Sequence, residues 1–147
     1  VLSPLFVKKG WALQIQGKES RGEILKKHKT LIQCGKTSIL FGTGSFSEGL
    51  DLPRDLLKNL IITKIPFAVP TSPVEQAHAE YIELKGGNPF MQIAVPEASK
   101  KLIQSVGRLL RTEEDSGKVT ILDRRVVSKR YGKLLLDSLP PFKRIIE

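Results

Sequence analysis

Hydrophobic residues along this chain follow two spacings, and each spacing predicts a different kind of element. Short uninterrupted apolar runs predict strands, whereas apolar residues that recur every three or four positions predict amphipathic helices. The runs predict strands over residues 11–16, 38–41, 60–65 and 119–122, and a short extended segment over residues 91–95. The helical spacing predicts helices over residues 20–35, 72–86, 98–111 and 128–139.

Two of these helices begin with the same capping pattern. Ser20 is followed three residues later by Glu23, and Ser72 is followed by Glu75. In such a capping box each side chain binds a backbone N–H of the first turn that has no partner within the helix. The alternation of strands and helices predicts the α/β class with a largely parallel sheet, in which ligands bind beyond the carboxyl ends of strands.

The composition adds a basic bias that is unevenly distributed. The 147 residues carry 24 Lys and Arg against 15 Asp and Glu, for a net charge of +9. Residues 1–41 and 97–147 carry +6 and +5, whereas residues 42–96 carry −2. Two basic flanks suit a polyanion partner such as nucleic acid, although solvated lysines on helix surfaces explain the same pattern. A membrane surface is disfavoured because no helix pairs a basic face with a large aromatic-rich apolar face.

The single cysteine limits which kinds of protein this chain can be. Cys34 is the only cysteine, which excludes an internal disulfide and a multi-cysteine metal site within this sequence. One free thiol fits a reducing compartment, and we expect a cytoplasmic protein. No apolar stretch approaches the roughly 20 residues that span a bilayer. Because the sequence begins at Val1 instead of Met, we expect it to be a piece of a longer protein.

The third predicted helix has two faces of opposite character. At about 100° per residue, Gln104, Arg108 and Arg111 fall within a stripe about 60° wide. Two arginines one turn apart favour an anion between them, such as a triphosphate or a nucleic-acid backbone. A solvent-exposed basic face, or ion pairs to the acidic residues 113–115, explains the stripe as well. Gly107 leaves room for a ligand to approach closely. The opposite side of the helix carries Leu102, Val106, Leu109 and Leu110.

The loop after the second predicted strand is the other feature with chemical character. Residues 42–53 combine three glycines with several hydroxyl side chains, so backbone N–H groups can converge there on an anion. Glu48 and Asp51 add carboxylates that can accept hydrogen bonds from a sugar hydroxyl or an arginine. A long polar turn is the plain alternative, but the length and composition of the loop favour a ligand role.

Residues 35–37 read Gly-Lys-Thr, like the end of a phosphate-binding P-loop. The full pattern needs a glycine five residues earlier, where Thr30 stands. A helix end followed by a turn fits this triplet better, so we expect no P-loop in this chain.

The loop and the third helix together resemble two motifs of superfamily 2 helicases. Residues 47–51, Ser-Glu-Gly-Leu-Asp, resemble motif V of the XPD/DinG type. Residues 104–111, Gln-Ser-Val-Gly-Arg-Leu-Leu-Arg, match the Q-x-x-G-R-x-x-R pattern of motif VI. Further stretches similar to DinG-like helicases, including the YoaA group, lie at residues 65–67, 72–74, 121–125 and 131–133. The resemblance covers nearly the whole chain.

The resemblance implies a RecA-like three-layer α/β/α sandwich. Residues 1–147 would form the second RecA-like domain of an ATP-dependent DNA helicase, and the usual first strand of that domain would lie before Val1. The P-loop, the Mg²⁺ ligands and any iron–sulfur cluster would belong to other domains. The implied partners are single-stranded DNA and the first RecA-like domain, with 5′→3′ movement and a role in DNA repair or replication stress.

The resemblance also implies roles for individual residues at the nucleotide. Arg111 is the expected arginine finger, Arg108 a second contact to the γ-phosphate, and Gln104 a residue that positions a phosphate oxygen or the attacking water. Asp51 is expected to bind the ribose or an arginine of motif VI, with Glu48 in the same network. The expected nucleotide site also includes Gly49 and Gly107.

On the other side of the motif V loop, Thr43, Gly44 and Ser45 are expected to donate hydrogen bonds to DNA phosphates, which carry no sequence information. A non-enzymatic nucleic-acid-binding module is the alternative function. A free-standing α/β enzyme is disfavoured, because the sequence offers no evident catalytic nucleophile or metal cluster.

Several conspicuous side chains suit structural roles better than functional ones. Phe46 and Trp11 can stack on bases, but we expect both to pack within the protein. His28 and His78 lie beside apolar residues of predicted helices, so we expect both at the edge of the core. We expect a structural ion pair among Asp123, Arg124 and Arg125, which follow a strand end.

Overall fold

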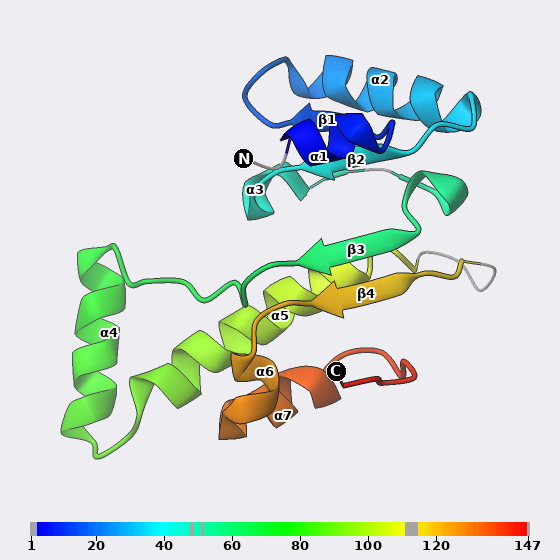
Figure 1. The fold of residues 1–147 in the computed structure, drawn as a ribbon. Coiled ribbons are helices and arrows are strands. Elements are labelled where there is room, and N and C mark those ends of the chain that lie inside the picture. The colour runs from blue at the N-terminus through cyan, green and yellow to red at the C-terminus, as the bar shows by residue number, and fades with distance from the viewer. Residues whose placement is uncertain (1–2, 48, 51, 111–114, 147) are drawn as a thin grey trace.

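The computed structural model describes residues 3–47, 49–50, 52–110 and 115–146 (Figure 1). Its four strands are β1 (Ala12–Ile15), β2 (Ser38–Phe41), β3 (Asn59–Ile62) and β4 (Lys118–Ile121). Strand β1 pairs in parallel with β2, and β3 pairs in parallel with β4. Strands β2 and β3 point the same way in Figure 1, so the carboxyl ends of both pairs lie toward one edge.

The predicted α/β class and the parallel strands are confirmed. The single sheet that we expected is divided into two pairs, and no ladder joins β2 to β3 within the described part of the chain. Strand β3 also ends three residues earlier than predicted. Beyond Ile62 the chain turns away, and the N–H of Ile65 donates to the Asp123 carboxylate (3.0 Å) instead of to a strand.

Both predicted capping boxes are present. Helix α2 (Arg21–Gln33) begins after Ser20, whose hydroxyl accepts from the N–H of Glu23 while the Glu23 carboxylate accepts from the N–H of Ser20. Helix α4 (Pro73–Leu84) begins with the same exchange between Ser72 and Glu75. Gly35 has a φ of 70°, so the turn that follows α2 suits glycine, as expected from a helix end.

The extended segment predicted over residues 91–95 is wrong. These residues form η2 (Phe90–Ala94), a π-helical turn that continues directly into α5 (Val95–Val106). The prediction relied on Pro96, because a proline after an apolar run also fits the end of an extended segment. Pro96 is the second residue of α5, and proline is common at the first positions of an α-helix. Helix α5 therefore begins before residue 98, and it ends before residue 111.

The helix predicted over residues 128–139 is α7 (Arg130–Asp137), and a short helix that was not predicted, α6 (Arg125–Ser128), precedes it. Lys129 separates them with an extended backbone (φ −113°, ψ 145°). The two helices approach closely at Gly132, where an added β-carbon would lie 2.0 Å from the Val126 carbonyl oxygen. The remaining short elements are α1 (Ser3–Lys8), α3 (Gly44–Ser47) and η1 (Arg54–Leu56).

Two clusters of buried side chains form the core. One lies between α5, α6, α7 and the carboxyl ends of β3 and β4, and the other lies between α2 and the loop that follows β2. The first comprises Ile65, Val95, Ala98, Leu102, Val126 and Leu135. The second comprises Ile24, Phe46, Leu50 and Leu52.

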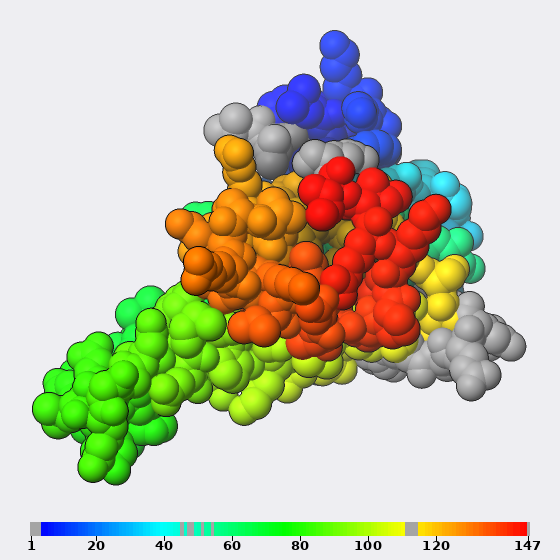
Figure 2. Space-filling view, turned by 90° about the horizontal axis from the view of Figure 1, so that it is seen from below, coloured from blue at the N-terminus to red at the C-terminus, as the bar shows by residue number. Residues whose placement is uncertain are grey.

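Helix α4 projects from the body of the molecule, as Figures 1 and 2 show for this green segment. None of its residues is buried, and Val74 and Leu84 are 78% and 85% exposed. The prediction that His78 lies at the edge of the core is therefore wrong, because His78 is exposed on a helix that has no buried residue. The same prediction is confirmed for His28, which is 4% exposed. Within the described ranges, no helix is both long and apolar enough to cross a bilayer.

Candidate functional site

Helix α5 presents a polar face above a buried one. On the predicted apolar side, Leu102, Val106 and Leu109 are at most 3% exposed and Leu110 is half-buried, which confirms that this side packs against the protein. Gln104 is exposed and Arg108 is partly exposed. No hydrogen bond or ion pair holds either side chain within the residues that the structure describes. An amide and a guanidinium group at the end of this helix are therefore available to a ligand.

The end of α5 fixes where Arg108 lies. The N–H of Arg108 donates to the Ser105 carbonyl (3.2 Å), which tightens the chain into a turn after Val106. Leu109 then packs against Gly117, where an added β-carbon would lie 2.6 Å from Leu109 and 2.7 Å from the Lys58 carbonyl oxygen. Gly117 and Lys58 immediately precede β4 and β3, so Arg108 lies near the amino ends of this strand pair.

The predicted site also includes Gly107 and Arg111. Gly107 has an ordinary helical backbone (φ −63°, ψ −14°), and a β-carbon there would lie 3.2 Å from the Ile103 carbonyl oxygen, a tight contact. Its approach to a ligand stays a prediction. Arg111, the predicted arginine finger, lies outside the described residues.

The loop after β2 is held by two contacts. Thr43 donates from its N–H (2.8 Å) and from its hydroxyl (3.0 Å) to the side-chain oxygen of Gln16, which follows β1. Phe46 is 6% exposed and fills the space beside Gly42, where a β-carbon would lie 2.6 Å from the Phe46 ring. Phe46 therefore anchors the loop, as predicted, and is not available to stack on a base.

Part of this loop lies outside what the structure describes: Glu48, Asp51 and the side chain of Ser45. Gly44 is exposed at the start of α3. Gly49 has a φ of 68°, a conformation that favours glycine whatever its contacts. Trp11 is half-buried and stacks on Phe6 at a centroid distance of 5.8 Å, which agrees with the packing role predicted for it.

The structure places the two predicted groups at opposite edges of the strands. Thr43 and Gly44 follow the carboxyl end of β2, whereas Arg108 lies near the amino ends of β3 and β4. Figure 1 shows the same separation, with α3 at the arrowhead side of the strands and the end of α5 at the opposite side. Thr43 and Gly44, which precede motif V, and Arg108 of motif VI thus lie on two separate surfaces.

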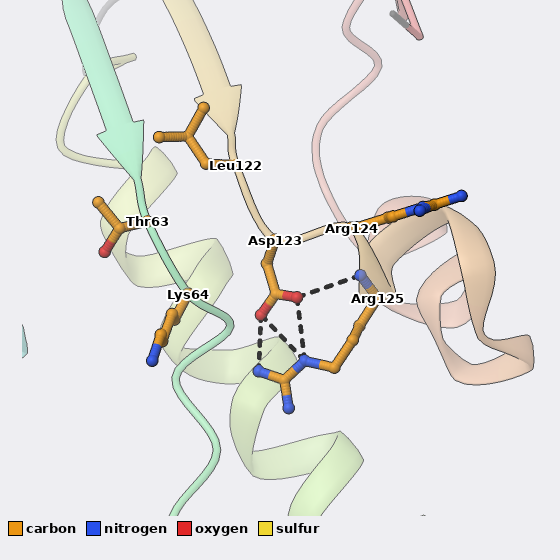
Figure 3. Close-up of a pocket in the computed structure, with 6 residues that line it drawn as sticks. All are labelled: Thr63, Lys64, Leu122, Asp123, Arg124 and Arg125. Atoms are coloured by element: carbon orange, nitrogen blue, oxygen red, sulfur yellow. Dashed lines mark hydrogen bonds and ion pairs between the residues drawn. The ribbon is translucent and has the colours of Figure 1, made fainter.

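A third polar site lies at the carboxyl ends of β3 and β4 (Figure 3). It is an open hollow of about 380 Å³ between the loops that follow the two strands. Sequence reasoning considered Asp123, Arg124 and Arg125 but missed the residues that face them from β3. The sequence carried no signal for Thr63 and Lys64, because the strand predicted over residues 60–65 contained both, and β3 ends at Ile62. The hollow is lined by Thr63, Lys64, Leu122, Asp123, Arg124 and Arg125.

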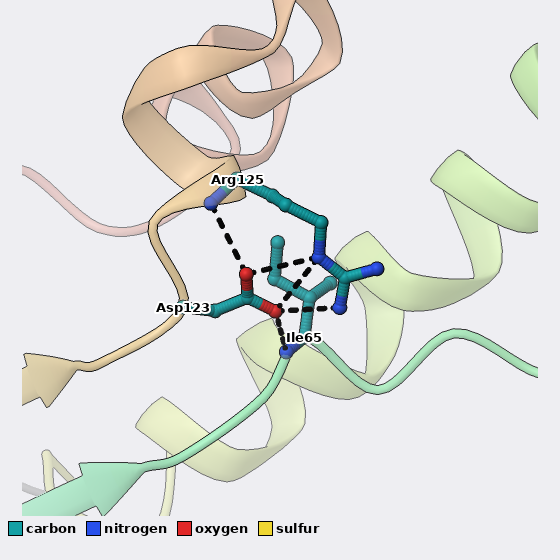
Figure 4. Close-up of polar contacts among 3 residues, drawn as sticks. All are labelled: Ile65, Asp123 and Arg125. Carbon is teal, nitrogen blue, oxygen red and sulfur yellow. Dashed lines mark hydrogen bonds and ion pairs between the residues drawn. The ribbon is translucent and has the colours of Figure 1, made fainter.

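The predicted structural ion pair is present in this hollow, between Asp123 and Arg125 (Figure 4). The hydrogen bond from the Arg125 guanidinium is the main reason that the pKa of the Asp123 carboxyl lies well below its usual range. The backbone N–H groups of Ile65 and Arg125 also donate to this carboxylate and lower the pKa further. The guanidinium also lies over the Phe67 ring, 5.4 Å from its centroid. Asp123 therefore joins the two loops as a carboxylate.

We find no candidate metal site among the described residues. No group of three or more His, Cys, Asp or Glu residues there is arranged to hold a metal ion. Cys34 is exposed and unpaired with any other cysteine.

The chain matches a domain family and several longer proteins. The family model described as "Helicase C-terminal domain" matches residues 2–142. The ATP-dependent DNA helicase DinG of Photobacterium profundum is 75% identical over 146 residues, which cover 99% of this chain and 21% of that protein. The helicase of the same name from Escherichia coli (strain K12) is 42% identical over 130 residues, which cover 88% of this chain and 18% of that protein.

A further relative bears a different name. The 3′-5′ exonuclease DinG of Bacillus subtilis (strain 168) is 43% identical over 121 residues, which cover 82% of this chain and 13% of that protein. The chain thus spans about a fifth or less of the length of these relatives.

Proposed function

We propose a function on the premise that this chain belongs to the helicase C-terminal domain family. Residues 1–147 act as the second RecA-like motor domain of an ATP-dependent DNA helicase that moves 5′→3′ along single-stranded DNA. The longer relatives from Photobacterium profundum and Escherichia coli are each named ATP-dependent DNA helicase DinG, which supports the helicase part of this proposal. The setting that we propose is the cytoplasm, in DNA repair or under replication stress.

The observation that carries this proposal is the end of helix α5. Gln104 and Arg108 reach solvent there without a polar partner among the described residues, while the opposite face of the helix is buried. An unpaired guanidinium in the turn that ends α5 suits a phosphate, because it can donate two parallel hydrogen bonds to phosphate oxygens. ATP would lie between this surface and the first RecA-like domain.

In this arrangement the residues of motif VI act on the γ-phosphate. Arg111 is the arginine finger, which neutralises the charge that develops on the transferred phosphoryl group. Such a group contributes roughly 10³–10⁵ in rate. Arg108 makes a second phosphate contact, and Gln104 orients a phosphate oxygen or the attacking water. Because Gln104 lies in α5 and Arg108 lies in the turn that ends it, a movement of α5 would carry both toward or away from the nucleotide together.

The residues of motif V connect the two surfaces. Asp51 binds the ribose or an arginine of motif VI, and Glu48 belongs to the same network. Gly49 and Gly107 complete the nucleotide side. Mg²⁺ and the P-loop belong to the first RecA-like domain, and any iron–sulfur cluster belongs to another segment, since Cys34 is the only cysteine here.

The opposite edge of the strands faces DNA. Gly44 is exposed at the start of α3, and Thr43 is held in place by Gln16. Together with Ser45 these residues contact backbone phosphates. Both donors of Thr43 are bound to Gln16, so a contact between Thr43 and a phosphate would replace one of those hydrogen bonds. Closing and opening of the ATP cleft would then move this edge along the strand.

The exonuclease name of the Bacillus subtilis relative does not direct the proposal toward nucleic-acid cleavage. This chain spans 13% of that protein, so the name does not assign the nuclease activity to the matching segment.

The test compares the isolated chain with the full-length helicase. Because the P-loop lies in another domain, we expect the chain alone to release no phosphate from ATP, with or without an oligo(dT) strand. The full-length protein should hydrolyse ATP and should do so faster with oligo(dT). ATP turnover by the pure chain, or a full-length protein that hydrolyses no ATP, would overturn the proposal. Tight DNA binding by the chain together with an inactive full-length protein would favour the non-enzymatic binding module.

A further inference from the structure

The hollow at the carboxyl ends of β3 and β4 has a net positive charge, and that charge is unevenly placed. It contains one acidic and three basic side chains. The Asp123 carboxylate forms an ion pair with Arg125, whose nearest nitrogen lies 2.6 Å from Oδ2, and accepts a hydrogen bond from the N–H of Ile65. The side chain of Asp123 is 8% exposed, so this pair forms the floor of the hollow and contributes little net charge.

Two cations remain at the rim. Lys64 follows β3 and Arg124 follows β4, and both are exposed. Neither side chain has a hydrogen bond or an ion pair within the described ranges. Figure 3 shows that Arg125 turns toward Asp123 whereas Arg124 extends away from it, and that Lys64 lies on the other side of the pair. The two unpaired charges therefore flank the neutral pair on opposite sides.

The shape of the site indicates what it binds. Five of the six lining residues are exposed, so the hollow is an open surface and not an enclosed pocket for a small molecule. Separated cations on an open surface suit an extended chain of phosphates better than a single anion. Leu122, which is 62% exposed, offers an apolar contact to a sugar or a base between the phosphates.

The position of the hollow relates it to the loop after β2. Both follow the carboxyl ends of strands, and Figure 1 shows β2, β3 and β4 pointing toward the same edge. A strand of nucleic acid that crosses Thr43 and Gly44 can continue along this edge to β3 and β4. The end of α5, which we assign to ATP, lies at the other edge.

We propose that Thr63, Lys64 and Arg124 form a second phosphate-binding site for single-stranded DNA, which extends the contacts of the motif V loop. Lys64 and Arg124 bind successive parts of the backbone, and the hydroxyl of Thr63 donates a hydrogen bond to a phosphate between them. The Asp123–Arg125 pair holds the loops that follow β3 and β4 together, so that Lys64 and Arg124 can bind the same DNA strand. The proposal rests on the helicase function above, because it extends the DNA edge of that motor.

The test uses the full-length helicase with the double substitution Lys64→Ala and Arg124→Ala. Its affinity for oligo(dT) is measured at several salt concentrations. The loss of two phosphate contacts should weaken binding about tenfold and should lower the slope of log K against log salt by about 1.4. The charge-conserving exchange Lys64→Arg with Arg124→Lys should keep both the affinity and the slope near the wild-type values.

The matched control removes the same charge elsewhere. Lys26→Ala with Lys29→Ala, both on exposed positions of α2, should leave affinity and slope unchanged. If the wild-type helicase shows DNA-dependent ATP hydrolysis but the double variant binds oligo(dT) with unchanged affinity and slope, the second site is wrong and the motor function stands. If the wild-type protein shows no DNA-dependent ATP hydrolysis, the motor function fails and this site fails with it.

Discussion

Asp123 and Arg125 form a two-point ion pair in which Oδ2 lies 2.6 Å from a terminal guanidinium nitrogen and Oδ1 lies 2.9 Å from Nε. The same carboxylate accepts the N–H of Ile65, 58 residues earlier in the chain. One acidic side chain thus connects the segment after β3 to the start of α6. This connection fixes the carboxyl edge of the β3–β4 pair.

The first prediction concerns the pH dependence of this pair. Its hydrogen bonds lower the pKa of Asp123 in the folded state, so its contribution to stability is present above the ordinary carboxyl pKa and is lost as the pH falls below about 4. Asp123→Asn should lower the free energy of unfolding by about 1.5–3 kcal/mol at pH 7. Urea unfolding at pH 7, 5, 4 and 3 should show the difference from wild type shrinking at the acidic end. A difference that stays constant from pH 7 to pH 3 would contradict this account.

The second prediction concerns the contact between α6 and α7. Gly132→Ala places a β-carbon 2.0 Å from the Val126 carbonyl oxygen, which forces the backbone of the two helices apart. We expect a loss of at least about 3 kcal/mol in urea unfolding. The control is Gly22→Ala in α2, where a β-carbon meets nothing within 4 Å. That substitution should be neutral or should stabilise by up to about 1 kcal/mol. Equal effects of the two alanines would show that the helices do not approach as described.

The third prediction is that the two histidines contribute differently to stability. The ring of His28 contacts the Ser38 hydroxyl through Nδ1 and the Leu56 carbonyl through Nε2, each at 2.9 Å. Because a carbonyl only accepts, Nε2 donates, and in the neutral ring Nδ1 accepts from Ser38. His28→Ala should cost about 2–3 kcal/mol of unfolding free energy. His78→Ala on the exposed helix α4 should change it by less than about 0.5 kcal/mol. If the two substitutions lowered the free energy of unfolding by similar amounts, this would contradict the finding that His28 is buried and His78 is exposed.

Much of this fold follows from local sequence signals. Ser20 with Glu23, and Ser72 with Glu75, marked two helix starts correctly, because a capping box depends only on residues three apart. The buried stripe through Leu102, Val106 and Leu109 was also predictable, since it depends only on helical spacing. The helicase family was predicted correctly from residues 47–51 and 104–111, where residue type and order are specific.

The errors arose where distant parts of the chain decide the structure. Pro96 opens α5, although a proline after an apolar run also fits the end of an extended segment. Val74 and Tyr81 have the spacing of a buried face, but spacing does not say whether another element covers it, and both are exposed. Lys64 was missed as a site residue because its significance depends on lying opposite Arg124, which follows β4.

The central claim is that Arg111, Arg108 and Gln104 act on the nucleotide. The most direct test is the rate of ATP hydrolysis by the full-length helicase carrying Arg111→Ala, measured with saturating ATP and oligo(dT). We expect kcat to fall by at least about 10³-fold while ATP binding changes only a few-fold, because a finger acts mainly on the transition state. Arg130→Ala, an exposed arginine of α7, is the control and should keep wild-type turnover. Turnover by the Arg111→Ala variant that stays within a few-fold of wild type would contradict the claim.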